Sequence, residues 1–369
     1  MQSTLKSRYG GEVFLLYKGR EAIELALKNL KLPKKSCVAI NGFTCFAVYE
    51  AIKNAGFNVE YLDIEKNDLN FSSETLQKSI KKNPNVKVVI VQNTLGYPCQ
   101  IEEIARICKD NKVILIEDLA HSVGTKYSDG KEAGTVGDIV VLSFSQDKMI
   151  DGISGGALIT RNPEVASLGG PAKPDRGNLS YQIELRDRFY PTLTYIIRNF
   201  YPFGLGKIMH EFFKNLDLLS NPMGGLSTIH NLPAWYCNLI KLQFEKLEEN
   251  LTHRKKIATI YAEGINQNIS STQIKKLIPF SSNLRFPIFV KNKDSLVSFL
   301  KNHGVYISDI WYDSPIAPKK YLSQTDYSGQ CPTAEVTSSE ILNLPTHINV
   351  SEKDAKKISQ LINQWLKLT

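Results

Sequence analysis

The regular alternation of strand-like and helix-like segments between residues 19 and 118 constrains the fold of this chain most. Short runs rich in Val and Ile alternate there with amphipathic runs, the strand-like ones at 37–40, 58–64, 86–94 and 113–118 and the helix-like ones at 20–30, 45–56, 72–83 and 101–111. Such alternation is typical of an α/β fold whose sheet is mostly parallel. We therefore predict a large domain in which a mostly parallel mixed sheet is flanked by helices.

The length of the chain predicts a second domain. Its 369 residues exceed what one hydrophobic core usually holds. A long helical pattern begins near Ala234, and a strand-like run at 285–290 precedes helical runs at 293–304 and 351–368. We expect a large domain at 1–235, with an irregular helical insertion at about 176–226, and a smaller C-terminal α+β domain at 236–369.

The composition argues against several classes of partner. The net charge is +8, but the lysines are spread as short pairs, so we expect no nucleic-acid partner. The six cysteines are far apart and show no C-x-x-C spacing, which predicts neither a metal site nor a disulfide framework and fits a reducing compartment. No run resembles a signal peptide or reaches the ~18 apolar residues of a membrane span. We therefore expect a cytoplasmic protein.

Two charged side chains come at the ends of buried strand-like runs. Asp118 closes the run 113–118, and Lys148 follows the run 138–145. In open α/β sheets, ligands bind at the carboxyl ends of the strands. Taken alone, such a lysine usually extends to solvent, and such an aspartate can cap a turn. Together they also suit pyridoxal phosphate, because an amine can bond the aldehyde carbon of this cofactor and a carboxylate can keep its ring nitrogen protonated.

The block IEDLAHSVGTKYSDGKEAGTVGDIVVLSFSQDKMIDGISGGALITRN, residues 116–162, resembles the core of the DegT/DnrJ/EryC1/StrS aminotransferases, sugar-modifying enzymes with the aspartate-aminotransferase fold. Similar segments occur at 41–65, 93–104 and 331–347, and the resemblance is weak between 163 and 230. The positions that match the core motifs of the family are Glu117, Asp118, Ala120, His121, Gly137, Asp138, Ser143, Phe144, Lys148, Gly155, Gly156 and Ala157.

This resemblance implies roles for four residues of the block. Lys148 corresponds to the Schiff-base lysine, Asp118 to the partner of the pyridinium nitrogen, and His121 to the side chain beside the ring hydroxyl. Ser143 corresponds to a serine that contacts the phosphate of pyridoxal 5'-phosphate. Because desolvation near the cofactor lowers the pKa of a lysine amine, the freed Lys148 is expected to shuttle the proton of transamination.

The expected phosphate site departs from the family pattern. The N–H groups of a helix start bind phosphate, and Gly19, Arg20 and Glu21 lie where the family reads Gly-Thr-x-Ala, with Arg20 in place of the threonine. In the family, an asparagine of the partner subunit also contacts the phosphate. Asn231 corresponds to it here, with His230 as the alternative. The resemblance therefore implies a homodimer.

The aromatic side chain that stacks on the cofactor ring in the family is also replaced. Its position holds Cys45, so we expect Phe43 or Phe46 to cover the ring. Segments that line the cleft in the family correspond to three residues that could equally serve in packing, namely Trp311, Tyr312 and His347.

The resemblance implies an aminotransferase with small-molecule substrates. The amino group is expected to pass from an amino acid, with glutamate as the expected donor, to a keto group of a nucleotide-linked sugar. The related dehydratase branch carries histidine at the position of Lys148, which argues against that activity. The alternative is a regulatory or assembly protein that keeps the fold and the cofactor without transamination. A dinucleotide oxidoreductase is disfavoured, because no G-x-G-x-x-G follows the first strand.

Residues 186–219 resemble the family least. Aromatic and aliphatic side chains alternate there with Arg and Lys, and Pro191, Pro202 and Gly204 interrupt the segment. This pattern suits a helix pair that rests on an anionic membrane without spanning it. It suits equally a helical flap over the cleft or the dimer interface, and of the two we favour the flap.

Overall fold

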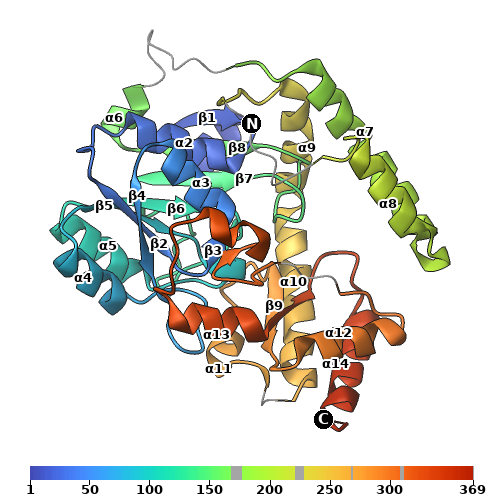
Figure 1. Ribbon diagram of the computed structural model, residues 1–369. Helices are drawn as coiled ribbons and strands as arrows, with labels where there is room; N and C mark the ends of the chain where they lie inside the picture. Colours follow the sequence, from blue (N-terminus) through green and yellow to red (C-terminus); the bar gives the residue numbers. More distant parts are fainter. Residues whose placement is uncertain (168–176, 221–227, 267–268, 308–310, 369) are drawn as a thin grey trace.

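A seven-stranded sheet forms the centre of the computed structural model, which describes residues 1–167, 177–220, 228–266, 269–307 and 311–368 (Figure 1). β8 pairs antiparallel with both of its neighbours, and the other strands run in one direction. The prediction of a mostly parallel mixed sheet is therefore confirmed. In the order β1-β8-β7-β6-β5-β2-β4, the strands are β1 (Glu12–Leu16), β8 (Gly156–Thr160), β7 (Ile139–Ser143), β6 (Ile114–Asp118), β5 (Val86–Val91), β2 (Cys37–Asn41) and β4 (Asn58–Leu62).

Apolar side chains on both faces of the sheet hold the helices. On β2, Val38 and Ile40 join the core under α2 (Gly19–Asn29) and α3 (Phe46–Asn54), whereas Ala39 joins the core under α4 (Ser73–Lys82) and α5 (Ile101–Asp110). Successive side chains of a strand point to opposite faces, so the central strands are apolar throughout. Some helices begin with a capping side chain. At the start of α4, the hydroxyl of Ser72 accepts a hydrogen bond from the Thr75 N–H.

The antiparallel direction of β8 positions the loop that carries Lys148. A parallel neighbour would require a crossover, usually a helix, whereas an antiparallel neighbour can follow after a short return. The connection between β7 and β8, residues 144–155, makes this return over the carboxyl end of β7. Asp147 adopts a left-handed backbone conformation within it, with φ of 63°. The loop thus places Lys148 at the carboxyl edge of the sheet.

The C-terminal part of the chain builds a second core. Its strands β9 (Arg285–Phe289) and β11 (Ile341–Pro345) pair antiparallel, and α14 (Glu352–Leu366), which begins with a capping box at Ser351 and Asp354, packs on α10 (Leu247–Gly264) and α12 (Lys293–Asn302). Phe43 and Leu95 from the N-terminal part also belong to this core. The division of the chain at residue 235 stays a prediction.

Shorter elements complete the described chain. β3 (Thr44–Cys45) pairs parallel with β10 (Ile316–Ala317), which joins the N-terminal part to the C-terminal part beside the carboxyl edge of the sheet. The remaining elements are α1 (Gln2–Tyr9), η1 (Thr94–Gly96), α6 (Pro163–Ala166), α9 (Ala234–Glu245), α11 (Thr272–Leu277), η5 (Lys319–Gln324) and α13 (Pro332–Glu340).

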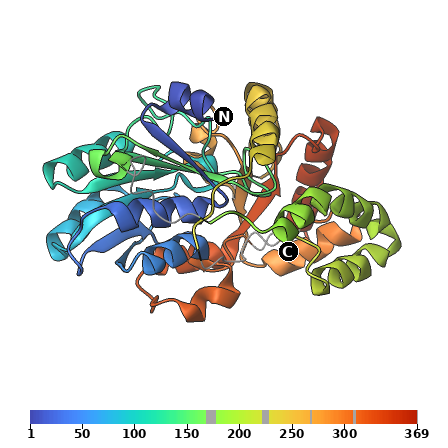
Figure 2. The same cartoon turned by 90° about the horizontal axis from the view of Figure 1, so that it is seen from above.

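A helical hairpin occupies the expected insertion, although residue 176 and residues 221–226 of that range lie outside the described residues. The hairpin comprises α7 (Tyr181–Phe200), η3 (Tyr201–Phe203) and α8 (Leu205–Asn215), and it lies on the side of the molecule away from α4 and α5 (Figures 1 and 2). Asp187 fixes its base, because Oδ2 accepts hydrogen bonds of 2.7 Å from the hydroxyls of both Tyr17 and Tyr236. Within the described residues, no helix combines the length and the low polarity that crossing a bilayer requires.

Candidate active site

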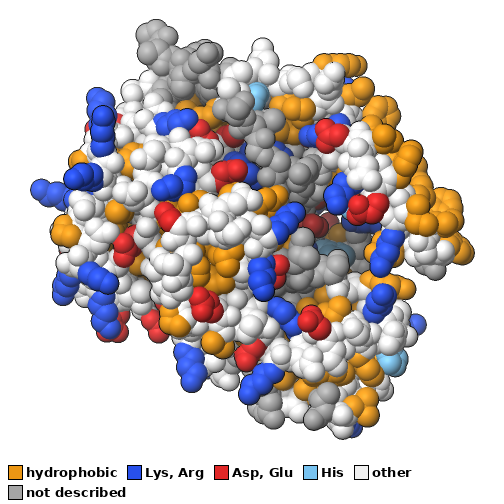
Figure 3. All heavy atoms as spheres, in the orientation of Figure 1, with side chains coloured by type: hydrophobic (Ala, Val, Ile, Leu, Met, Phe, Trp, Pro, Cys, Tyr) orange, Lys and Arg blue, Asp and Glu red, His pale blue; other side chains and the backbone are white. Residues whose placement is uncertain are grey.

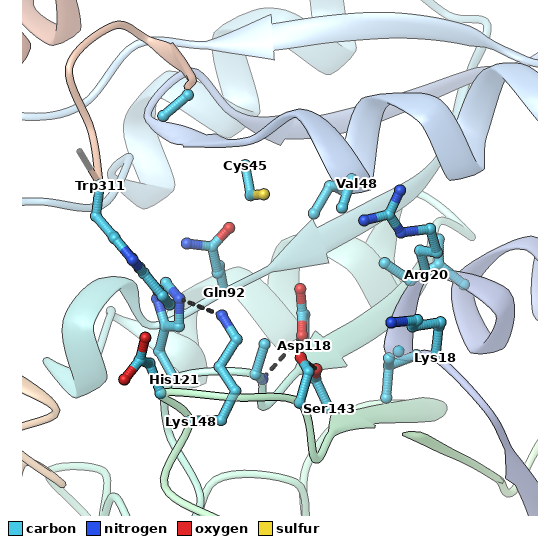
Figure 4. A pocket seen from close by; sticks show the side chains of 18 of the residues that line it. Lys18, Arg20, Cys45, Val48, Gln92, Asp118, His121, Ser143, Lys148 and Trp311 are labelled. Carbon is cyan, nitrogen blue, oxygen red and sulfur yellow. Dashed lines mark hydrogen bonds between the residues drawn. The ribbon is translucent and has the colours of Figure 1, made fainter. Parts of the chain in front are cut away.

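A pocket of about 280 Å³ lies at the carboxyl ends of β6 and β7 (Figure 4). The sheet, the starts of α2 and α3, and the segment that leads into β10 contribute its walls. Six of the predicted site residues line it, namely Lys148, Asp118, His121, Ser143, Gly19 and Arg20. Its other lining residues are Lys18, Ile23, Cys45, Ala47, Val48, Gln92, Ala120, Val141, Ser145, Gln146, Asp147, Trp311, Tyr312, Ala317 and Pro318.

The amine of Lys148 reaches into this pocket. Its Nζ lies 3.1 Å from Nε2 of His121 and 4.2 Å from the centre of the Trp311 ring. The pocket walls remove water from the amine, and this desolvation lowers the pKa of Lys148. A lysine with a lowered pKa is a better nucleophile and proton acceptor at neutral pH.

Hydrogen bonds orient the ring of His121 against this amine. The backbone N–H of Leu95 donates to Nδ1 at 3.3 Å, and burial lowers the pKa of His121, so the ring is neutral with its proton on Nε2. The hydroxyl of Tyr312 lies 3.4 Å from the same Nδ1 and accepts a hydrogen bond of 2.6 Å from Gln92. His121 can therefore donate from Nε2 to the amine of Lys148 whenever that amine is unprotonated.

Asp118 closes β6 at the floor of the pocket. One carboxylate oxygen accepts a hydrogen bond of 2.9 Å from the N–H of Ala120. Burial raises the pKa of Asp118 to about 6, and the charge of Lys148 offsets this rise only in part. A buried carboxylate with a raised pKa is stabilised by a cation, which a protonated ring nitrogen would supply.

A tight cradle forms where the start of α2 approaches β7. A Cβ on Gly19 would come within 2.8 Å of the Cβ of Ser143, so this approach requires glycine. The hydroxyl of Ser143 lies 3.0 Å from that of Ser145, and both face the pocket beside the N-terminus of α2. Hydroxyls next to a helix start are suited to a phosphate group.

These groups fit pyridoxal phosphate. The aldehyde of this cofactor requires an amine, its ring nitrogen a carboxylate, and its phosphate a cradle of N–H and hydroxyl donors. Lys148, Asp118 and the cradle at Gly19 and Ser143 supply these in one pocket.

Four predicted cofactor contacts do not line the pocket. Glu21 is buried and pairs with His230, whose Nδ1 lies 3.3 Å from its carboxylate. Asn231 is exposed, and its backbone forms a bridge with that of Leu16. The other two are aromatic. The Phe43 ring stacks on Tyr312 at 4.4 Å, and the Phe46 ring stacks on Tyr321 at 4.9 Å.

Cys45, Trp311 and Lys18 line the pocket where those four residues do not, and the sequence analysis named the first two. Cys45 stands between the two phenylalanines and points into the pocket (Figure 4), whereas Trp311 forms the wall opposite α2. Lys18 was missed, although a lysine directly before the glycine of a helix start was the available signal.

Comparison with known proteins identifies the family of the chain. The model of the DegT/DnrJ/EryC1/StrS aminotransferase family matches residues 14–169 and 191–363. A UDP-4-amino-4,6-dideoxy-N-acetyl-beta-L-altrosamine transaminase of Campylobacter jejuni is 25% identical over 355 residues, which cover 94% of this chain and 84% of that protein. The GDP-perosamine synthase of Escherichia coli O157:H7 is 31% identical over 144 residues, 39% of each protein.

A solved structure shows the same fold. The Helicobacter pylori aminotransferase PseC, involved in the biosynthesis of pseudoaminic acid, superposes with a TM-score of 0.75 at 17% identity and covers all of this chain and 90% of its own. The family model spans most of the sequence, including every residue from β1 to β8 that lines the pocket. The chain belongs to the DegT/DnrJ/EryC1/StrS aminotransferase family.

Proposed function

We propose that this protein is a pyridoxal-phosphate-dependent aminotransferase that moves an amino group from an amino acid, with glutamate as the expected donor, to a keto group of a nucleotide-linked sugar. One observation carries the proposal. The desolvated amine of Lys148 lies 3.1 Å from His121 in the same pocket as the buried carboxylate of Asp118.

Each of these side chains has a defined task in transamination. When bound, the cofactor supplies an electron sink for the charge that develops at the substrate carbon. Lys148 would hold the cofactor covalently, and its freed amine would accept a proton at Nζ and return it to the neighbouring carbon. Asp118 keeps the ring nitrogen protonated, and His121 orients the amine of Lys148 through Nε2–H.

The relatives support the class of acceptor. One is named a transaminase of a UDP-linked amino sugar, and another is named GDP-perosamine synthase. The regulatory alternative is disfavoured, because a protein without transamination has no need for a lysine whose pKa is lowered beside a neutral histidine.

We also propose a cytoplasmic homodimer. The six cysteines are free, which suits a reducing compartment. A partner subunit is the expected source of a further phosphate contact, since Asn231 does not reach the pocket of its own chain. The α7–α8 hairpin is expected to serve as a flap over the cleft or at the subunit interface, with contact to an anionic bilayer as the alternative.

Reduction with borohydride tests the function directly. The purified protein should be yellow, and reduction should fix the cofactor on Lys148, as mass spectrometry of tryptic peptides will show. Lys18, which lines the same pocket, serves as the internal control. A label on Lys18 in place of Lys148 would overturn the assignment. Glutamate should then convert the aldehyde form of the cofactor to the amine form. A suitable keto-sugar nucleotide from a panel should convert the amine form back to the aldehyde.

A further inference from the structure

Lys18 places a second ammonium group in the pocket. It is the N-cap residue of α2, between β1 and Gly19, and its side chain lines the pocket beside Arg20 and Ser143. In Figure 4, Lys18 and Arg20 stand together on one side of the pocket, across from His121 and Trp311. Lys18 therefore lies at the end of the pocket where the Gly19 cradle is.

Within the described residues, no carboxylate forms an ion pair with this ammonium, whose Nζ lies 4.8 Å from the centre of the Tyr17 ring. Lys18 is only 6% exposed, and within the described residues its one hydrogen-bond acceptor is the hydroxyl of Ser154, at 3.3 Å. The carboxylates of Asp187 and Glu21 act on it from a distance, and that of Asp187 already accepts hydrogen bonds from two tyrosine hydroxyls. Burial lowers the pKa of Lys18 to about 8. An enclosed cation of this kind is unfavourable unless an anion joins it.

The position in the helix adds to this cost. N-cap positions favour Ser, Thr, Asp, Asn and Gly, and the positive end of the helix dipole repels a cation. Lys18, the N-cap residue of α2, makes no capping hydrogen bond with its side chain. Two sources of positive potential, the ammonium of Lys18 and the N-terminus of α2, thus lie side by side at this end of the pocket. A dianionic ligand there would relieve both.

Arg20, which the sequence placed in the phosphate site, is less suited than Lys18 to bind an anion there. Its guanidinium forms an ion pair with Glu50 of α3, so its charge is already neutralised. Lys18 has no such carboxylate within the part of the chain that the structure describes. The basic side chain that is available for an anion is therefore that of Lys18, two residues before Arg20.

We propose that Lys18 binds the phosphate monoester of the cofactor, together with the N–H groups at the start of α2 and the hydroxyl of Ser143. This inference rests on the proposed function, because it assumes that pyridoxal phosphate occupies the pocket. A nucleotide diphosphate offers the same chemistry from a second source, and the experiment separates the two.

Binding to the cofactor-free protein tests the proposal without measuring turnover. Pyridoxal 5'-phosphate and pyridoxal, which lacks the phosphate, are titrated against wild type, Lys18→Met, Lys18→Arg and Lys28→Met, with absorbance as the readout. Lys28 is the matched control, because it lies on α2 and pairs at the surface with Glu24. Lys18→Met should weaken binding of pyridoxal phosphate about tenfold or more, the scale of one charge-assisted hydrogen bond, and leave pyridoxal unaffected.

The controls distinguish the possible outcomes. Lys18→Arg should restore part of the affinity, and Lys28→Met should match wild type. Equal weakening of both ligands by Lys18→Met would indicate a structural role and overturn the proposal, as would no weakening at all. UDP is titrated against the same proteins by calorimetry. If Lys18→Met changes the affinity for UDP and leaves that for pyridoxal phosphate unchanged, Lys18 belongs to the nucleotide and not to the cofactor.

Two further measurements keep the result interpretable. The cofactor-free Lys18→Met protein should melt at the same temperature as wild type or above it, because an unpaired buried charge has been removed. If wild type takes up pyridoxal phosphate and Lys18→Met binds it equally well, the inference fails and the proposed function stands. If wild type takes up none, both fail.

Discussion

Asp118 is an aspartate enclosed at the end of β6, where burial raises its pKa to about 6. In the unfolded chain the same carboxyl has a pKa near 3.8. The folded protein therefore binds a proton more tightly than the unfolded chain, and the free energy of unfolding falls as the pH rises from about 4 to 6. The cofactor-free protein thus carries a destabilising charge at neutral pH, as is common where a residue serves catalysis.

Asp118→Asn is expected to separate the cost of this carboxylate to stability from its contribution to catalysis. At pH 7 the cofactor-free variant should unfold with a free energy up to about 3 kcal/mol above wild type, and the gap should close near pH 4, since one pKa unit corresponds to about 1.4 kcal/mol. The variant should still bind the cofactor but lose at least about a hundredfold in transamination rate, because a neutral amide does not hold the ring nitrogen protonated. Urea titrations at both pH values and a single-turnover assay measure this. Turnover near the wild-type rate would assign the role to another carboxylate.

The sequence reveals some site residues better than others, for physical reasons. Lys148 and Asp118 could be predicted because strand ends bring their side chains to one edge whatever the packing around them. Which of the neighbours Phe43, Cys45 and Phe46 faces the pocket could not be predicted. Cys45 does so, and it lies in β3, whose partner β10 is far away in the chain.

At the scale of elements, the alternating pattern predicted the central sheet and its helices, because burial on both faces leaves continuous apolar strands. The sequence also predicted a helix pair at 186–219, but not how the hairpin of α7 and α8 is attached to the sheet domain. Polar contacts with residues far away in the chain attach it. Asp187 accepts from the hydroxyls of Tyr17 and Tyr236. Glu184 accepts from the indole N–H of Trp235. No local pattern signals a contact of this kind.

Asp187→Ala is expected to release the base of α7. Two hydroxyls lose a charged acceptor, so the free energy of unfolding should fall by on the order of 3 kcal/mol. Trypsin should then cleave the hairpin faster, at Arg188 and Arg198 among other sites. Asp217→Ala is the matched control, because Asp217 pairs with Arg186 at the exposed surface, 3.2 Å away, and should cost less than about 1 kcal/mol. Equal protection of both variants from trypsin would show that other contacts hold the hairpin.

At the scale of the whole molecule, the hairpin leaves an apolar strip on the surface. Figure 3 shows hydrophobic side chains gathered along this edge. Such a strip on a protein of this size marks a contact surface. The exposed side chains that form it include Tyr181, Phe189, Tyr195, Phe200, Tyr201, Phe203, Leu205, Ile208 and Phe212.

Replacing Phe200, Tyr201 and Phe203 by serine should decide what covers the strip. A flap over the cleft or the interface predicts that the variant loses catalysis and that neither protein pellets with anionic vesicles. Membrane contact predicts that wild type pellets, less so at high salt, and that the variant does not. Replacement of the exposed Phe280 and Val336 by serine is the matched control.

Light scattering on the same samples should find a homodimer, and an active monomer would contradict the proposed assembly.

The wall formed by Trp311, Tyr312 and Pro318 has a consequence for the order in which the molecule assembles. These residues come late in the chain, whereas Lys148, Asp118 and Ser143 are synthesised early. Contacts between distant parts of a chain form late in folding, because loop closure precedes any gain from them. In a nascent chain, Lys148 is therefore present before the wall at 311–318 can close the pocket. Tight capture of the cofactor therefore has to wait until residues 311–318 have been synthesised and have folded against the carboxyl edge of the sheet.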